Sequence, residues 1–341
     1  MIISKEFENL INSIPVIKAD RNYWFVRTEG GEYYEDFING KYIAIGYDEI
    51  QYSDVIIGKK NDWSSTFQFT QRVRELLPKE KRPGYVAGQL IRFTYLIKKG
   101  DIVIIPNKNS NILHFGEVAE SFAYSKDNND DCPHEKRKRV KWIKHESRVK
   151  LEAELYKLVF THTTISNANE YANYVDRLLN NVFIKGEETH LFLDVQQPNK
   201  IDQSDFYGFG NIFDLVKEIC DEENINIDER FTVKSNVQSP GFIEIIQASA
   251  IPLGIIFAGL VIMALTGGKI TTKFKVTKEK GLDIEMGANV PVGLIERIGN
   301  NLRKKRELKM KADIVKKALE NMQIENPSDL VKLIEDSNKN N

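Results

Sequence analysis

The sequence lacks several features that identify common classes of protein. Its two cysteines, Cys132 and Cys220, lie far apart in 341 residues, which excludes the disulfide framework of a small secreted domain. It has no phosphate-binding glycine motif of the Walker A or G-x-G-x-x-G kind, and Gly208-Phe209-Gly210 is a lone loop signal. A nucleophile elbow and a zinc-spaced ligand set are also missing. We therefore expect no bound metal and no cofactor.

The chain also has almost no excess of either charge. Its 48 Lys and Arg residues balance 49 Asp and Glu residues, which gives a net charge of -1, although 28% of all residues are charged. No global field attracts the protein to nucleic acid or to a membrane, so any such preference must come from a local patch. The first fifteen residues carry acidic groups and no apolar run of the signal-peptide kind, which favours a cytoplasmic protein.

One long uncharged run interrupts this charged background. Residues 248–265 read ASAIPLGIIFAGLVIMAL. As a helix the run would be about 27 Å long, close to the roughly 30 Å hydrocarbon core of a bilayer. Ala250, Gly254 and Ala258 follow at intervals of four, and such a small-residue face lets membrane helices approach and self-associate. We expect a membrane-active segment over 241–268; the alternative is a buried helix of a soluble assembly.

The charges around this run leave its topology open. Lys269, Lys273 and Lys275 follow the run, and the positive-inside rule then places the C-terminal part in the cytosol. A permanent single span would put residues 1–245 outside, which conflicts with their cytosolic character. A re-entrant segment, a segment inserted on activation and a buried helix each resolve the conflict. The expected location is cytoplasmic, either membrane-associated or single-pass in the inner membrane.

An ordered set of short motifs occupies the first 150 residues. It comprises Tyr23-Trp24-Phe25-Val26-Arg27, then Ile43 to Tyr47, then Lys99 to Pro106 with Phe115 to Val118, and finally His134 to Trp142. In this order the motifs resemble the PUA/EVE-like small β-barrels at the N-terminus of Mrr-type restriction endonucleases and other prokaryotic defence proteins. The resemblance covers about residues 20–148, and Tyr47 stands where many relatives have Trp.

The resemblance implies a pocket that accepts a flipped, often modified base, or a nucleotide. A flipped base needs aromatic faces for stacking and a few hydrogen bonds along its edge. The candidates for stacking are Trp24, Tyr47 and Trp63, with Arg27 and Asp101 as polar partners. The alternative for each aromatic side chain is a place in the core of the barrel.

A basic strip follows the motifs. Eight Lys and Arg residues fall between positions 136 and 150, with Trp142 among them. Such a strip neutralises phosphates even on a neutral protein. The residues expected to contact phosphates are Lys136, Arg137, Lys138, Arg139 and Lys141. The alternative is a solvated strand edge, since lysines also protect edges from aggregation.

The nuclease domain that accompanies such barrels has no clear counterpart. That fold holds Mg²⁺ with an Asp and, on the next strand, a Glu/Gln-x-Lys group. The nearest match is Asp194-Val195-Gln196-Gln197, with Lys200 out of register. We therefore expect a protein without catalytic activity, and only Asp194 and Lys200 are candidates for a degenerate nuclease site.

Together these patterns predict an α+β protein with four segments. They are a PUA/EVE-like sensor domain over 1–150, an α/β coupling domain over 151–240, the apolar segment over 241–268, and a β-hairpin with a basic amphipathic helix over 269–341. The expected function is that of a prokaryotic antiviral defence effector, which senses nucleic acid, a modified base or a nucleotide, forms a homo-oligomer and acts on membrane lipid. A separate recognition protein such as a short Argonaute is an expected partner. The alternatives are an Mrr-like restriction nuclease with a degenerate site and a soluble nucleic-acid-binding scaffold.

Overall fold

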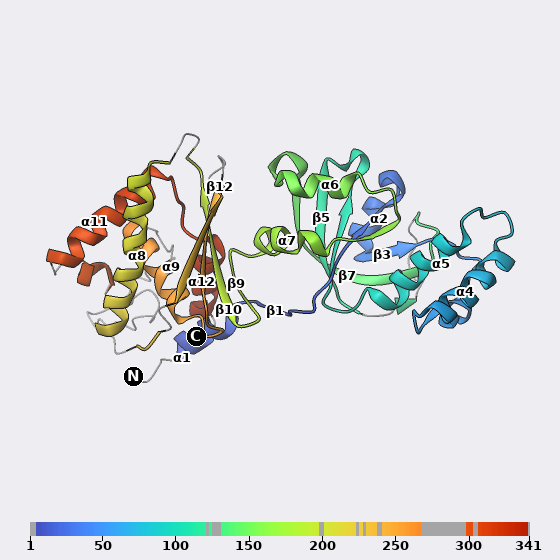
Figure 1. Cartoon of the computed structure of the whole chain (residues 1–341), viewed down its shortest axis with the longest axis horizontal. Helices are drawn as coiled ribbons and strands as arrows, with labels where there is room; N and C mark the ends of the chain where they lie inside the picture. Colours follow the sequence, from blue (N-terminus) through green and yellow to red (C-terminus); the bar gives the residue numbers. More distant parts are fainter. Residues whose placement is uncertain are drawn as a thin grey trace, which may run out of the picture. The chain divides into compact units, whose positions relative to one another are not determined.

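The structure is a computed structural model that describes residues 5–120, 123–124, 131–197, 201–222, 225–227, 230–236, 241–266, 298–302 and 306–339. These residues form a mixed α+β protein with two mixed sheets, one of them a half-barrel, which confirms the expected class. Two compact units divide the chain: unit 1 comprises Met1–Ala19 and Asn180–Asn341, and unit 2 comprises Asp20–Leu179 (Figure 1). Residues 151–179 of the expected coupling domain thus belong to unit 2, and residues 180–240 to unit 1.

Unit 2 is built on a sheet that contains the sequence motifs. Across the sheet its strands are β3 (Tyr42–Ile45), β7 (Lys136–Ser147), β5 (Ile112–Val118), β4 (Ile102–Pro106), β2 (Tyr23–Val26) and β8 (Ile165–Asn167), and β6 (Ala123–Tyr124) pairs with β7. The pair β2–β4 is parallel, and the other neighbours are antiparallel. The strands β2 and β4 therefore lie in the interior of the sheet.

Both faces of this sheet are covered, which explains the unbroken apolar runs of β2 and β4. Trp24 and its register partner Val103 pack into one buried cluster, whereas Phe25 and its partner Ile104 pack into another. A strand that is buried on both sides has no polar face, so its sequence does not alternate. The helical elements of unit 2 are η1 (Glu29–Gly31), α2 (Tyr34–Gly40), α3 (Tyr52–Val55), η2 (Ile56–Gly58), α4 (Trp63–Leu76), α5 (Pro83–Ile91), the π-turn η3 (Arg92–Leu96), η4 (Lys108–Ser110), η5 (Arg148–Lys150), η6 (Ala153–Leu155), α6 (Tyr156–Val159), η7 (Asn169–Tyr171) and α7 (Ala172–Leu179).

Unit 1 is a helix-covered sheet made from both ends of the chain. Its strand order is β1 (Val16–Ile17), β9 (Val182–Lys185), β10 (Glu188–Val195), β12 (Gly241–Gln247) and β11 (Phe231–Asn236). Its helices are α1 (Lys5–Ser13), α8 (Gln203–Glu222), α9 (Leu253–Thr266), α11 (Arg306–Asn321) and α12 (Ser328–Lys339). Figure 1 shows α8, α9 and α11 on one side of the sheet, where their apolar side chains form one continuous core.

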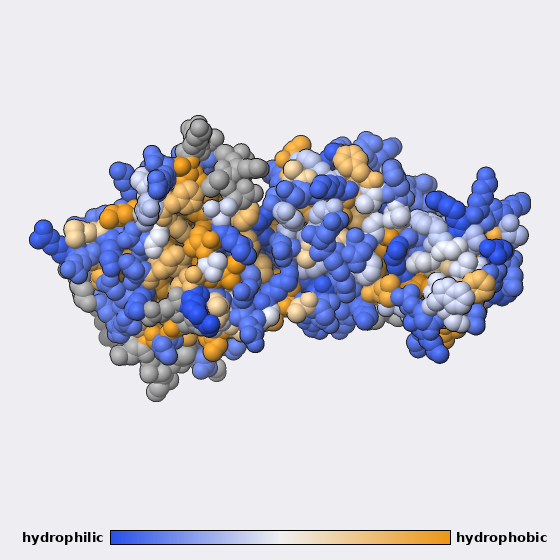
Figure 2. Space-filling view, in the orientation of Figure 1, coloured by the Kyte–Doolittle hydropathy of each residue, from blue (hydrophilic) through white to orange (hydrophobic). Residues whose placement is uncertain are grey.

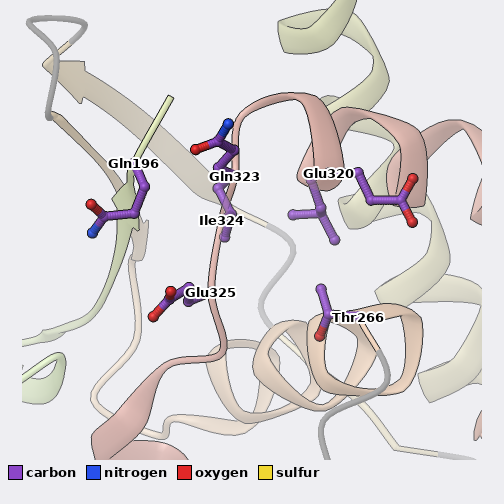
Figure 3. A pocket seen from close by; sticks show the side chains of 7 residues that line it. Gln196, Thr266, Glu320, Gln323, Ile324 and Glu325 are labelled. Atoms are coloured by element: carbon purple, nitrogen blue, oxygen red, sulfur yellow. The ribbon is translucent and has the colours of Figure 1, made fainter. Parts of the chain in front are cut away.

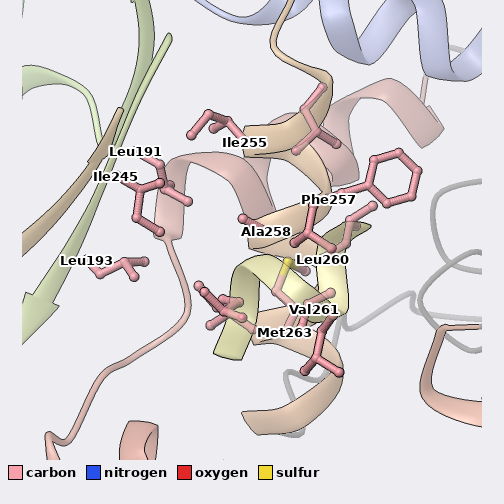
Figure 4. Close-up of a cluster of buried hydrophobic side chains, with 14 of the residues drawn as sticks. Leu191, Leu193, Ile245, Ile255, Phe257, Ala258, Leu260, Val261 and Met263 are labelled. Carbon is pink, nitrogen blue, oxygen red and sulfur yellow. The ribbon is translucent and has the colours of Figure 1, made fainter. Parts of the chain in front are cut away.

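The apolar run forms the centre of this core. Residues 241–247 are the strand β12, and the helix α9 has 14 residues, which is a length of about 21 Å. Every residue from Gly254 to Met263 is buried, and Figure 4 shows Ile255 and Ala258 on the side of α9 toward Leu191, Leu193 and Ile245 of the sheet, with Phe257 on the opposite side. Among the described residues, no helix combines the length and the apolar character that crossing a membrane requires. The predicted transmembrane segment is therefore not supported, and the alternative of a buried helix describes α9.

The small residues of the run also have a different role from the predicted one. Ala250 precedes α9 and is exposed, so the three residues do not share one helical face. A Cβ at Gly254 would lie 2.6 Å from Cζ of Phe231, and Ala258 is fully buried. Both residues let α9 approach its own neighbours in unit 1. The face that the sequence assigned to self-association is used for packing within the chain.

The helix α9 begins only at Leu253, five residues into the apolar run, because a proline precedes it. Pro252 has no N–H to donate, and Leu253 is the first helical residue. The N–H of Ile255 instead donates to Oε1 of the buried Gln247 side chain at 3.3 Å, which satisfies one end group of α9. The predicted hairpin over 269–286 and the basic residues 303–305 lie outside the described residues.

Candidate functional site

The loop after β3 holds an aromatic side chain in a strained conformation. Tyr47 has φ 66°, in the left-handed region that residues other than glycine rarely adopt. Its ring is half-buried, and burial, followed by the influence of Tyr85, raises the pKa of its hydroxyl. Strain of this kind costs roughly 1–3 kcal/mol and persists only where the surroundings impose it. The position of Tyr47 is therefore imposed by the residues around it.

A half-buried histidine lies against the same loop. A Cβ at Gly46 would lie 3.0 Å from Cε1 of His134, so glycine is what allows this approach. Nε2 of His134 is 2.8 Å from Oε1 of Glu29, and Nδ1 is 3.6 Å from Oδ2 of Asp48. The hydrogen bond to Asp48 raises the pKa of His134, against the opposing effect of burial, and Glu29 raises it further. The His134 ring thus lies between two carboxylates.

Asp48 anchors the loop to the start of β7. It accepts hydrogen bonds from the N–H of Glu135 at 3.1 Å and from Nζ of Lys136 at 3.2 Å. Nζ of Lys136 also donates to the carbonyl oxygen of Tyr47 at 2.9 Å. Burial disfavours the ionised carboxylate, but the hydrogen bonds from His134, Glu135 and Lys136 outweigh it and lower the pKa of Asp48 to about 2.

The first turn of α5 completes the surroundings of Tyr47. The Tyr85 hydroxyl accepts the N–H of Thr164 at 2.9 Å, which fixes the ring. The Arg82 guanidinium lies 4.8 Å from the centre of this ring. The charge of Arg82 opposes part of the rise in the pKa of Tyr47, so Arg82 lies within electrostatic reach of the Tyr47 hydroxyl. We call Tyr47, Asp48, Tyr85, His134 and Lys136 the Tyr47 site.

Trp24 and Asp101, two predicted ligand contacts, bind each other inside unit 2. Nε1 of Trp24 donates to Oδ2 of Asp101 at 2.9 Å, and both residues are buried. Asp101 also accepts the N–H groups of Asn22 and Lys98, at 3.1 and 2.9 Å. These contacts fix the turn before β4 and leave neither side chain facing a ligand.

Arg27 and Trp63 also lie outside the Tyr47 site. The Arg27 guanidinium donates to the carbonyl oxygens of Val159 and Thr161, which ties down the loop after α6. Trp63 begins α4 and is 82% exposed. Of the five predicted ligand contacts, the structure thus places only Tyr47 at this site.

Three of the eight basic residues of the strip point inward. Lys136, Arg137 and Lys138 are buried, and each has partners within unit 2. Arg137 donates to the carbonyl oxygen of Cys132 at 2.9 Å and lies 4.2 Å from the centre of the Tyr42 ring.

Nζ of Lys138 donates to the carbonyl oxygen of Ile97 at 3.0 Å, and burial lowers its pKa to about 8. Only Arg139 and Lys141, among the five predicted phosphate contacts, are exposed. These inward directions have a simple cause. The three residues are consecutive and therefore point to both faces of β7, and both faces are covered where β7 pairs with β3.

The nuclease candidates form no metal site in the described part of the chain. Asp194 lies on β10 opposite Phe242, and Lys200 lies outside the described residues. The described residues contain no group of three or more His, Cys, Asp or Glu side chains that could hold a metal ion. The segment after Asp194 pairs instead with the end of α11, through Gln196 and Gln197.

Unit 1 contains a separate hollow of about 290 Å³. Its lining residues are Gln196, Thr266, Leu319, Glu320, Gln323, Ile324 and Glu325, shown in Figure 3. Two carboxylates and no basic group line it, so it does not suit a phosphate-bearing ligand.

The sequence pattern pointed to Tyr47 and, as a phosphate contact, to Lys136, but not to Asp48, Tyr85 or His134. Asp48 and His134 are separated by most of unit 2, and only the pairing of β3 with β7 brings them together. Tyr85 follows Pro83-Gly84, the helix start that the sequence indicates, yet a helix start does not show what its side chains contact.

Comparison with known proteins finds a similarity over the part of the chain that holds the Tyr47 site. A family model described as a domain of unknown function (DUF8426) matches residues 24–169. No curated protein and no solved structure matches the chain. The matched residues lie wholly inside unit 2 and include Tyr47, Asp48, Tyr85, His134 and Lys136, so the chain is similar to this family over its candidate site.

Proposed function

We propose that unit 2 is a PUA/EVE-like reader domain that binds nucleic acid, a modified base or a nucleotide, with the base held at the Tyr47 site. The observation that carries the proposal is the conformation of Tyr47. Its backbone is held at φ 66°, and its half-buried ring belongs to the site that Asp48, His134 and Tyr85 complete. A base needs a fixed aromatic face, and the constrained backbone of Tyr47 fixes the position of its side chain.

The charged groups of the site supply the other half of base recognition. Asp48 is an ionised acceptor. The pKa of His134 is raised, which favours the protonated ring, whose two nitrogens are both donors. A base edge presents both donors and acceptors, so a site with both kinds of group can read it. Arg82, which is exposed, is placed to meet a phosphate.

The biological setting follows from the resemblance to prokaryotic defence proteins. We place the reader in an antiviral defence system, where a partner such as a short Argonaute supplies or presents the nucleic acid. The proposal contains no membrane step, because α9, the segment that indicated one, lies in the core of unit 1. It also contains no cleavage step, because the described residues offer no metal site.

Binding of labelled oligonucleotides and free nucleotides tests the proposal. Single-stranded and double-stranded DNA and RNA, with cytosine or 5-methylcytosine, are compared by fluorescence anisotropy, and nucleoside monophosphates by calorimetry. Tyr47→Ala should weaken binding roughly 5- to 150-fold, the cost of one lost base stack, and Tyr47→Phe should retain most of it.

Tyr207→Ala is the matched control. Tyr207 is 71% exposed and lies in unit 1, so its removal should leave the affinity unchanged. Equal affinities for Tyr47→Ala and Tyr207→Ala, or no binding of any probe by the native chain, would overturn the proposal.

A further inference from the structure

The helix α4 presents two stacked aromatic rings to solvent. Trp63 is 82% exposed and Phe67, one turn later, is 50% exposed. Their ring centres are 5.5 Å apart and the ring planes differ by 11°. We call this pair the α4 platform. Hydrophilic residues cover most of the visible surface over α4 and α5 (Figure 2), which makes an exposed aromatic pair unusual there.

The stability of α4 does not account for these rings. The helix is started by Asp62, whose Oδ1 accepts the N–H of Ser65 at 2.7 Å. It packs on unit 2 through Ser65, Phe69 and Val73, which are buried. A tryptophan in water gains none of the burial free energy for which such a large side chain is used. The two rings are therefore available for a contact outside the fold.

The residues beside the platform indicate the chemistry of that contact. Lys59 and Lys60 are exposed and precede the N-cap Asp62 by three and two residues, and the charge of Lys60 reaches Asp62. Ser64 and Gln68, which follow Trp63 and Phe67 in sequence, are both exposed and polar. The platform is thus a small flat apolar surface with two cations beside it.

This composition favours a single-stranded nucleic acid over a protein. Lysine is depleted in protein–protein interfaces, whereas aromatic faces beside basic side chains are typical of single-strand binding. Every base has a π-face that can stack on an exposed indole, and the adjacent phosphates need a cation within reach. The Asp62 carboxylate occupies the start of the helix, so the cations are the two lysines and not the helix end.

We propose that the α4 platform is a second nucleic-acid contact, at which an unpaired base stacks on Trp63 and Phe67 while Lys59 and Lys60 contact phosphates. The inference rests on the proposed function of unit 2, because it assigns a further stretch of the same ligand. It adds a ligand class to the reader: a strand with at least one unpaired nucleotide. The Tyr47 site reads a base, and the platform holds the strand.

Anisotropy with labelled oligo-dT tests the platform. Trp63→Ala should weaken binding roughly 5- to 150-fold, and Phe67→Ala should weaken it less, because Phe67 is more buried. Replacement of Lys59 and Lys60 by Gln should reduce the slope of log K against log salt by about 0.7 for each lost phosphate contact. Phe160→Ala is the control, since Phe160 is 64% exposed in unit 2 and lies outside the platform.

Native fluorescence gives an independent readout. Trp24 is buried and Nε1 of Trp142 donates to the carbonyl oxygen of Phe37 at 3.0 Å, so Trp63 is the tryptophan that a strand can reach. Oligo-dT should quench the emission of the native chain, and this quenching should be absent in Trp63→Ala.

The outcomes separate this inference from the proposed function. Weaker oligo-dT binding in Trp63→Ala, with nucleoside monophosphate binding unchanged, supports the platform. Unchanged oligo-dT binding in Trp63→Ala, alongside a loss in Tyr47→Ala, overturns the platform and leaves the reader proposal intact. Loss of binding to phosphatidylglycerol vesicles in Trp63→Ala, without any effect on oligo-dT, overturns it in favour of a lipid contact. No binding by the native chain overturns both proposals.

Discussion

The position of α9 in the core can be tested with one methyl group. A Cβ at Gly259 would lie 2.0 Å from Cδ2 of Leu330 on α12. Leu330 is fully buried and cannot turn into solvent, so Gly259→Ala forces a shift of its side chain or of α12. Overpacking of this kind costs about 1–3 kcal/mol. Replacement of a helical glycine by alanine also stabilises the helix by about 1 kcal/mol, because alanine has the higher helix propensity.

The matched variant is Gly210→Ala in α8. Gly210 is also helical, and a Cβ there meets no atom within 4 Å. It should stabilise unit 1 by about 1 kcal/mol, through helix propensity alone. Because both variants gain the same propensity, the difference between them isolates the overpacking at Gly259. We expect Gly210→Ala to be more stable than Gly259→Ala by about 1–3 kcal/mol.

Urea unfolding followed by far-ultraviolet circular dichroism measures this difference. All three tryptophans belong to unit 2, so their fluorescence reports on that unit and serves as an internal reference. The difference should be seen in the dichroism and not in the fluorescence. Equal stability of the two variants would refute the packing of α9 against α12. A helix that left the core to enter a bilayer would give that result, because Leu330 would then not oppose the methyl group.

Two further predictions concern unit 2. Asp48 has a pKa of about 2, below the roughly 4 of an unfolded aspartate, so its ionised form stabilises the fold above pH 4 and this contribution is lost as the pH falls from about 4 to about 2. Asp48→Asn should therefore flatten the fall of the urea midpoint over this range, measured by tryptophan fluorescence, and an unchanged slope would contradict the ion-pair geometry. Trp24→Phe should cost unit 2 about 1.5–3 kcal/mol in the same unfolding assay, because it removes a hydrogen bond to the Asp101 carboxylate. It should leave oligonucleotide affinity unchanged, and a loss of affinity would restore Trp24 as a ligand contact.

The motifs of unit 2 coincide with its strands because their patterns are local. The motif Tyr23 to Arg27 contains β2, and the motif Lys99 to Pro106 contains β4. Trp24 and Asp101 were assigned to a ligand because an aromatic and a carboxylate in a small sheet are compatible with both a pocket and a core. Only their mutual hydrogen bond decides between these alternatives.

The apolar run was misassigned for a related reason. A helix that is apolar on every face fits a bilayer or a core that surrounds it, and hydropathy alone does not distinguish the two. The distinction lies in β9–β12 and in α8, α11 and α12, which surround α9 although they are distant in sequence. The same holds for Lys138, which is buried because both faces of β7 are covered where it pairs with β3.

The division of unit 1 between the two ends of the chain has a consequence for synthesis. Val16 of β1 pairs with Ile184 of β9, and the whole of unit 2 lies between them in sequence. Unit 2 can complete its fold while the ribosome is still making residues 180–341, since Arg21 and Asp176, near its two ends, are already joined by a 2.7 Å ion pair. Residues 1–19 can therefore pair with the rest of unit 1 only after the whole of unit 2 has been translated. Unit 2 thus forms before unit 1, and a ribosome that stops early would release unit 2 without unit 1.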